Sequence, residues 1–404
     1  MAKLNRAKQK SILQEKASSR GLRGYIAGTD WFTVFLCLVT SAYGVLLVHS
    51  ATLHRAKEGA LFSRDVITMI GGIGLGLALA LIMSFIDYEL LLKFWYVLAG
   101  ACLVLMLLLI PFGKGTTANP DAIRWLEITG SIDFQPSEVL KIGFIVSFTW
   151  HIYRVRGYIN EFKTILLLGA HALVPFGLVA YTGDLGSALV LLFITAGMLF
   201  LAGVKLRWFA ALGVVALAAA PLLWIYFISE FQRNRILAVY LPGMLDEATV
   251  KKFMYQQQQA VDAIGSGQLF GKGLFNSTVS VPVRESDMIF SMAGEELGFF
   301  GALAVVVLIA LVITRMILVS RRTRNLRARL LCAGVALMIG TQSIVNIGVC
   351  LKLLPVTGIT LPFFSAGGSS NMSLYLTIGL VLMVFRYQND HEDTQSYFDY
   401  LYSK

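Results

Sequence analysis

The chain has 404 residues, of which 56% are hydrophobic and only 14% are charged. Soluble domains carry about 25% charged residues. This composition, with a mean hydropathy of +0.70, therefore excludes an ordinary soluble protein and indicates a polytopic membrane protein. The net charge of +10 lies in short segments between apolar runs, a distribution that orients a membrane protein and does not indicate nucleic-acid binding.

Apolar runs long enough to cross a membrane recur along the whole chain. There are ten, at roughly 31–51, 66–86, 90–112, 137–154, 164–181, 185–203, 208–228, 287–319, 327–350 and 372–387. We therefore predict an all-α bundle of ten transmembrane helices in one domain, 31–387. A basic cytoplasmic tail precedes it at 1–30, because no small-residue cleavage site marks a signal peptide, and a second tail follows at 388–404.

Lysines and arginines in the short connections predict the orientation of the bundle. The connection before the ninth run is the most basic, with Arg315, Arg321, Arg322, Arg324, Arg327 and Arg329. It outweighs the basic residues at 52–65 and predicts cytoplasmic N and C termini. Four segments then lie on the outer face, at 113–138, 182–186, 229–287 and 351–371. The large loop 229–286 is too long for a simple connector and is expected to be functional.

The spacing of the cysteines and histidines matches no metal-binding motif. The cysteines, Cys37, Cys102, Cys332 and Cys350, lie in or beside apolar runs without a CxxC pair, so packed thiols are expected. The five histidines show no HExxH spacing, which argues against zinc.

The segment RWLEITGSIDFQPSEVLK, 124–141, places charged residues near the outer end of the fourth helix. Glu138 and Lys141 share one helix face, so they are expected to pair or to face a cavity. A structural ion pair explains them equally well. Arg124 and Trp125 come before them, and a tryptophan at this depth is often only an interfacial anchor.

Two further outer segments carry candidate residues. In TGDLGSALV, 182–190, Asp184 stands where the sixth helix should begin, and an N-cap role alone explains it. In the large loop, Arg233 and Arg235 are suited to bind phosphates through their guanidinium groups. GSGQLFGKG, 265–273, looks like a phosphate-binding loop, but its spacing fails, because Ser266 occupies the position of the first glycine.

The segment LKLLPVTGITLPFFSAGGSSNMS, 351–373, is rich in proline and glycine. LPVTG matches a surface-anchoring signal, but such a signal closes a secreted chain and does not fit inside a ten-span protein. We expect non-helical backbone that lines a cavity at the membrane edge. The backbone N–H groups near Ser369 and Ser370 are suited to an anion-binding nest.

The stretch RESDMIFSMAGEELGFFG, 284–301, carries four acidic residues, Glu285 and Asp287 at the start of the eighth helix and Glu295 and Glu296 within it. Asp287 is expected at the outer helix start, outward-facing and wet enough to ionise. Glu295 lies ~12 Å deeper and about 80° around the helix axis, whereas Glu296 points away. Hydrogen bonding within the bundle and a direct role in a cavity both remain open for the two glutamates.

Four blocks in this order resemble the signature segments of the SEDS family, the RodA/FtsW-type peptidoglycan glycosyltransferases. They are RWLEITGSIDFQPSEVLK, IGSGQLFGKG, SDMIFSMAGEELGFFGA and LPVTGITLPFFSAGGSSN, and the resemblance extends over essentially the whole chain. The FQRNRI and YQQQQAVDAIGSG portions look more like RodA than FtsW. Three departures suggest a divergent member: Val283 replaces a glutamate, TGDLG replaces a QPDLG-like motif, and Ala366 replaces a tyrosine.

The resemblance implies a function in cell wall synthesis during elongation, division or sporulation. Such proteins polymerise lipid II, a disaccharide-pentapeptide on undecaprenyl diphosphate, at the outer face of the bacterial cytoplasmic membrane. The reaction needs a base near the attacking hydroxyl and positive charge near the leaving group. The resemblance places the essential carboxylate at Asp287, as base or as ligand to a divalent cation, Mg²⁺ or Mn²⁺, with no organic cofactor.

The same resemblance implies a substrate-binding set and a partner. Lys141, Arg233 and Arg235 are candidates for the diphosphate and sugar, Glu138 would orient Lys141, and Trp125 would stack on a sugar. Arg124, Asp184, Ser369 and Ser370 complete the set. The implied partner is a class B penicillin-binding protein, a single-span transpeptidase. The alternatives are a flippase or transporter of lipid-linked precursors and a non-catalytic scaffold for the transpeptidase. The outer clustering of charges favours the enzyme.

Overall fold

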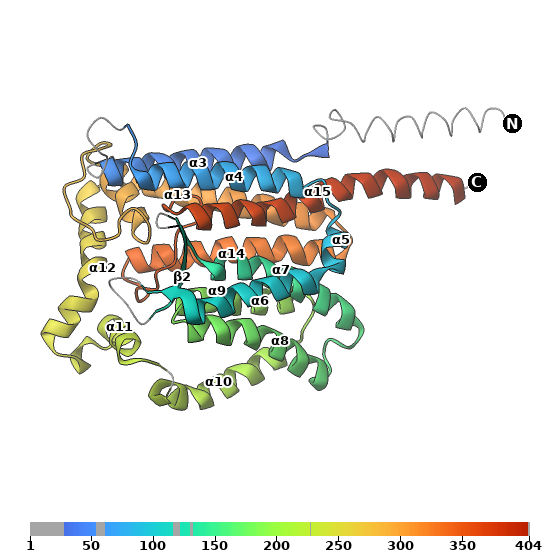
Figure 1. The fold of residues 1–404 in the computed structure, drawn as a ribbon, viewed down its shortest axis with the longest axis horizontal. Helices are drawn as coiled ribbons and strands as arrows, with labels where there is room; N and C mark the ends of the chain where they lie inside the picture. The colour runs from blue at the N-terminus through green and yellow to red at the C-terminus, as the bar shows by residue number, and fades with distance from the viewer. Residues whose placement is uncertain (1–27, 54–60, 116–121, 130–131, 227, 403–404) are drawn as a thin grey trace.

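The computed structural model describes residues 28–53, 61–115, 122–129, 132–226 and 228–402. The chain is mainly helical, and its long helices lie side by side (Figure 1). In chain order the elements are α3 (Trp31–Thr52), α4 (Arg64–Met83), α5 (Tyr88–Lys93), α6 (Trp95–Phe112), β1 (Gly113–Lys114), β2 (Trp125–Thr129), β3 (Ile132–Phe134), α7 (Pro136–Val155), α8 (Phe162–Tyr181), α9 (Leu185–Leu201), α10 (Leu206–Tyr226), α11 (Glu230–Tyr240), α12 (Glu247–Gly267), α13 (Ile289–Arg322), α14 (Leu326–Cys350) and α15 (Gly368–Tyr402), with short 3₁₀ turns at Arg156–Tyr158 and Pro242–Met244.

Eight of the described helices are long and apolar enough to cross a membrane: α3, α4, α6, α8, α10, α13, α14 and α15 as far as Tyr387. The remaining two predicted runs are occupied by α7 and by the 17-residue α9. The predicted helical, polytopic bundle is confirmed, whereas a count of ten spanning helices stays a prediction. The third run differs in one respect, because a bend at Phe94 divides it into α5 and α6.

The centre of the bundle is formed by α14 and α15. In each of them 72% of the apolar window is buried, whereas no window residue of α10 is buried. Glycines bring the backbones of α4 and α15 into contact: a Cβ at Gly72 would lie 2.2 Å from the carbonyl oxygen of Gly368, and one at Gly76 would lie 2.9 Å from Cα of Met372. Close backbone approach of this kind supplies the van der Waals contact that holds membrane helices together.

The predicted outer segments gather at one end of the bundle. Figure 1 shows β2, α11 and α12 at the end opposite to the C-terminal end of α15. The sequence did not predict the small antiparallel sheet β1–β2–β3, in which Lys114 pairs with Trp125 and Leu126 with Phe134. Nor did it predict that the large loop 229–286 folds largely into α11 and α12, capped by Ser229 and Asp246.

The two predicted tails differ in how much of each the structure describes. Residues 1–27, almost the whole basic tail, lie outside the described residues. The backbone of α15 continues past the predicted end of the last span, so the predicted tail is helical as far as Tyr402. All four cysteines are free and buried, which confirms the prediction of packed thiols.

Candidate active site

Asp287 lies in the turns that precede α13, at the end of the bundle that holds the outer segments. Its backbone carbonyl accepts a 2.8 Å hydrogen bond from Asn346 of α14. Burial raises the pKa of its carboxyl to about 6, although Arg124 and Arg235 both act to lower it. The sequence suggested a well-hydrated carboxylate, and in the structure Asp287 is partly buried and keeps some exposure to solvent. A carboxyl with this pKa is largely ionised at neutral pH and is basic enough to accept a proton.

Arg124 reaches the same place from the segment before β2. Its Nη2 donates to the carbonyl of Gly183 at 2.7 Å, and its Nη1 donates to that of Thr357 at 3.4 Å. At Gly358 a Cβ would lie 2.8 Å from Nη1 of Arg124 and 3.7 Å from Oδ2 of Asp287. The guanidinium and the carboxylate therefore both border Gly358. Within the described part of the chain, no ion pair of 4 Å or less joins them.

Arg235 of α11 supplies a second positive charge near Asp287. Its Nη1 donates to the carbonyl of Val356 at 3.1 Å, and its guanidinium lies 4.5 Å from the ring centre of Phe231. Burial lowers its pKa to about 10, so it remains positively charged at neutral pH. The other predicted arginine, Arg233, donates instead to the carbonyl of Ile228 at 3.0 Å, close to the end of α10. The structure thus brings one of the two arginines to Asp287.

Glu138 and Lys141 form a buried ion pair, with 2.8 Å between Oε1 and Nζ. Glu138 also borders a small cavity of about 10 Å³, roughly the space of one water molecule. Ser370, Asn371 and Gln342 line the same cavity. Both halves of the sequence prediction are therefore correct, because the pair exists and one member of it faces a cavity.

The two predicted serines lie in the first turn of α15. Both are buried, and the hydroxyl of Ser370 donates to the carbonyl of Gly367 at 3.3 Å. Ser370 borders the cavity beside Glu138, whereas Ser369 does not line it. An anion nest at these residues stays a prediction.

Asp184 caps α9, as the sequence suggested, by accepting a hydrogen bond from the backbone of Ser187 at 3.1 Å. Its second oxygen accepts hydrogen bonds from Gln135 and Ser137, each at 3.0 Å. Burial alone would raise its pKa, but Arg124 and Ser187 together hold the pKa below its usual value. Asp184 is therefore a charged link between α9, the start of α7 and Arg124.

Trp125 begins β2 and is half-buried opposite Lys114. Among the described residues, no hydrogen bond or ring contact joins Trp125 to Asp287. Its predicted role in stacking on a sugar stays a prediction.

The two glutamates of α13 lie at a break in that helix. At Gly298 the backbone leaves the helical region, with φ 66° and ψ −159°. The loop after α12 restores the broken backbone hydrogen bonds. The carbonyls of Glu295 and Glu296 accept from the N–H groups of Lys272 and Gly273, at 3.0 and 2.9 Å. The N–H groups of Phe299 and Phe300 donate to carbonyls of the same loop. Unpaired backbone groups are costly near lipid, so this exchange makes the break tolerable.

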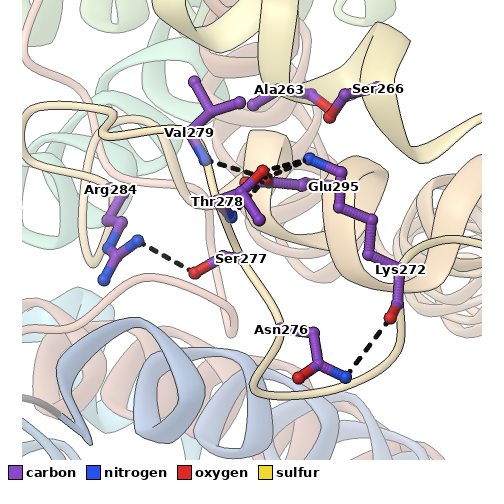
Figure 2. A network of polar contacts seen from close by, with 9 residues as sticks. All are labelled: Ala263, Ser266, Lys272, Asn276, Ser277, Thr278, Val279, Arg284 and Glu295. Atoms are coloured by element: carbon purple, nitrogen blue, oxygen red, sulfur yellow. Dashed lines mark hydrogen bonds and ion pairs between the residues drawn. The ribbon is translucent and has the colours of Figure 1, made fainter.

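Glu295 fixes the same loop through its side chain. Its Oε1 lies 2.8 Å from Nζ of Lys272 and accepts backbone hydrogen bonds from Thr278 and Val279, at 2.8 and 3.0 Å. Figure 2 shows these groups converging on the carboxylate. Glu296 accepts a hydrogen bond from the hydroxyl of Ser50 in α3. These contacts favour hydrogen bonding within the bundle over a direct role in the cavity.

The glycines of IGSGQLFGKG lie at the same contact, between the loop after α12 and the break in α13. A Cβ at Gly267 would lie 1.9 Å from the carbonyl oxygen of Gly294, and a Cβ at Gly271 would lie 2.1 Å from that of Glu296. These glycines allow two backbones to touch. This close approach, and not phosphate binding, accounts for the resemblance to a phosphate-binding loop.

The described residues contain no group of three or more His, Cys, Asp or Glu side chains that could hold a metal ion. The charged neighbours of Asp287 are Arg124, Arg235 and Glu285. Two carboxylates flanked by two arginines do not form a metal centre by themselves. A cation at Asp287 would need further oxygen ligands from a substrate or from water.

Comparisons with known proteins agree with this architecture. A family model described as "Cell cycle protein", for FtsW, RodA and SpoVE, matches residues 30–390. The chain is 31% identical over 375 residues to the probable peptidoglycan glycosyltransferase FtsW of Geobacter sp. (strain M18), covering 89% of this chain and 97% of the relative. For the protein of the same name from Coxiella burnetii the identity is 33% over 373 residues, with 88% and 95% covered.

Solved structures give the same result. One, from work on "structural coordination of polymerization and crosslinking by a peptidoglycan synthase complex", matches with a TM-score of 0.73 and 29% identity, covering 89% of this chain and 98% of that one. The rod shape determining protein RodA of Thermus thermophilus matches with a TM-score of 0.64 and 30% identity, with 89% and 97% covered. The relatives carry the name FtsW and this structure the name RodA, so these names do not separate the two.

Proposed function

Because the chain belongs to the FtsW, RodA and SpoVE family of cell cycle proteins, we propose that it is a peptidoglycan glycosyltransferase that polymerises lipid II. The observation that supports this most directly is the position of Asp287. Its partly buried carboxylate lies under the electrostatic influence of Arg124 and Arg235 at one end of an apolar bundle. A substrate whose lipid anchors it in the same membrane can deliver its charged head group to that level.

The chemistry follows from the charges. The acceptor sugar hydroxyl attacks the anomeric carbon of the lipid-linked donor, a new C–O bond forms, and the bond to the diphosphate breaks. Asp287 accepts the proton that the hydroxyl loses. Arg124 and Arg235 face the negative charge that develops on the diphosphate, and guanidinium groups suit phosphate oxygens. A divalent cation that binds Asp287 together with the diphosphate would supply Lewis-acid stabilisation of the same charge.

The position of the site in the cell and the partner also belong to this proposal. We place Asp287 at the outer face of the bacterial cytoplasmic membrane, because the arginine-rich connection between α13 and α14 lies at the opposite end of the bundle. A class B penicillin-binding protein is the proposed partner. The support is one structural relative, which comes from a peptidoglycan synthase complex that couples polymerisation to crosslinking.

The test uses the purified full-length chain in vesicles with fluorescent lipid II, with and without a single-span transpeptidase. We expect glycan polymer, strengthened by the transpeptidase and abolished by Asp287→Ala. The Asp287→Ala protein must be folded, as judged by its thermal unfolding midpoint. Translocation of lipid II without polymer would instead identify a flippase. Polymer formed at the wild-type rate by Asp287→Ala would overturn the assignment of the base.

A further inference from the structure

Three carbonyls of one loop hold the side chains that surround Asp287. The loop runs between α14 and α15 and includes Val356, Thr357 and Ile359. The carbonyl of Val356 accepts from Arg235, that of Thr357 accepts from Arg124, and that of Ile359 accepts from Asn346. Side chains from three distant parts of the chain are thus ordered by one short stretch of backbone.

Asn346 completes this arrangement from the middle of the bundle. It is 1% exposed, and its side-chain nitrogen donates to the carbonyls of Asp287 and Ile359, each at 2.8 Å. Both partners are acceptors only, so the amide must present its nitrogen to them. Cys350 also contacts the carbonyl of Asp287, with its sulfur 3.7 Å away. A single buried amide therefore joins the turn that carries Asp287 to the loop that holds both arginines.

Gly358 lets the loop lie close to both charged groups. Its φ is +75°, a region that side chains rarely adopt, and a Cβ there would meet Arg124 at 2.8 Å. The loop therefore needs glycine at the position where it borders Arg124 and Asp287.

We propose that Asn346 is a positioning residue for the glycosyl transfer: it locks the turn of Asp287 to the loop 356–359 and so sets the distance between the base and the two arginines. Asn346 touches no reacting group and acts through the backbone. The inference rests on the proposed function, because the base it positions is assigned there. The sequence offered one signal, an asparagine inside an otherwise apolar helix.

The experiment compares Asn346→Leu with a matched control, Gln257→Leu. Gln257 of α12 is also a buried amide that donates to two backbone carbonyls, those of Val349 and Leu354, at 2.9 and 2.7 Å. Among the described residues, no hydrogen bond joins Gln257 to the turn of Asp287. Both variants lose two hydrogen bonds of the same kind, so an effect on stability alone should be similar in both.

We expect Asn346→Leu to lower kcat for lipid II polymerisation by about 10²-fold, because displacement by about 1 Å can have an effect of that size. The acid limb of its pH profile should move to higher pH, because Asp287 moves away from Arg124 and Arg235 while Glu285 remains beside it. Gln257→Leu should keep the wild-type pH profile. Equal pH profiles for all three proteins would overturn the proposal.

A second variant tests the proposal if Asn346→Leu does not fold, and a second readout tests it without activity. Gly358→Ala disturbs the same lock from the loop side and should shift the acid limb in the same direction. If Asn346→Leu does not fold, an unshifted limb in Gly358→Ala would count against the proposal.

The second readout is the pH dependence of the thermal unfolding midpoint, each protein being compared with its own Asp287→Asn derivative. The raised pKa of Asp287 stabilises the folded protein at low pH, and this contribution is lost as pH rises through about 6. Asn346→Leu should move that loss to higher pH. This shift needs no activity, so it distinguishes a failure of the positioning role from a failure of the proposed function.

Discussion

Asp287 and Glu295 lie eight residues apart on one stretch of chain, and the structure gives them opposite surroundings. Asp287 has two arginines nearby but is locked to neither by a direct ion pair among the described residues. Glu295 is fully buried, and its Oε1 is saturated by Lys272 and by the N–H groups of Thr278 and Val279.

The difference teaches how to separate a chemical carboxylate from an architectural one in a membrane protein. A carboxylate whose oxygen is already occupied by fixed donors holds the protein together. A partly buried carboxylate that lies near positive charge, but is not paired with it, is available for a proton or a substrate. Four predictions test this distinction, starting with the largest effect.

The first prediction concerns chemistry. Asp287→Ala should reduce polymerisation by about 10²–10⁴-fold, the usual contribution of a general base. Glu295→Gln should keep the rate per folded molecule within a few-fold of wild type. The measurement is the rate of polymer formation from labelled lipid II, normalised to folded protein. Similar losses in both variants would erase the distinction between the two carboxylates.

The second prediction concerns the backbone contact between the end of α12 and the break in α13. Gly267→Ala places a Cβ 1.9 Å from the carbonyl oxygen of Gly294, so overpacking should destabilise the protein by about 1–3 kcal/mol or more. Gly265→Ala, two residues earlier on the same helix, meets no atom within 4 Å and is the matched control. Thermal unfolding in detergent measures both. The close-packing account fails if the two variants have the same unfolding midpoint.

The third prediction ranks the two glutamates. Glu295→Gln removes the charge that pairs with Lys272 and should lower stability by about 1.5–3 kcal/mol, typical for hydrogen bonds to a charged group. Glu296→Gln retains an acceptor for Ser50 and should have a smaller effect. Unfolding midpoints of both variants provide the check. A larger loss in Glu296→Gln would contradict the ranking.

The fourth prediction concerns pH. Wild-type activity should rise with pH through about 6 as Asp287 ionises. Arg235→Gln removes a positive charge that lowers this pKa, so the acid limb should move upward by up to about 1 pH unit. The limb of Glu295→Gln should stay in place, since the carboxylate of Glu295 is held by Lys272 and Thr278 and is not among the charged neighbours of Asp287. An unchanged or lowered acid limb in Arg235→Gln would mean that the charge of Arg235 does not act on Asp287.

Patterns along the chain predicted the fold well, because the membrane imposes them locally. Each run of about 20 apolar residues must form a helix to satisfy its own backbone. The predicted runs accordingly match the observed helices, except for the bend at Phe94, the break at Gly298 in α13 and the continuation of α15. The small sheet β1–β3 and helices α11 and α12 were missed, because outside the apolar runs no comparable constraint acts.

The site was predicted in part. The predicted contacts between residues close in sequence are confirmed: Glu138 pairs with Lys141, and Asp184 caps its helix. Local patterns did not reveal which of Arg233 and Arg235 faces Asp287, since the two differ only in their direction from α11.

The amino-acid sequence by itself determined that this protein is a helical membrane protein, which segments cluster at one end, and where its acidic residues lie along the chain. These properties follow from composition and local spacing. Only the tertiary structure decided what each acid does. The arginines near Asp287 come from segments far away in sequence, and the partners of Glu295 come from the loop 16 to 23 residues before it. The electrostatics of a carboxylate depends on which groups the fold brings within a few ångströms of it.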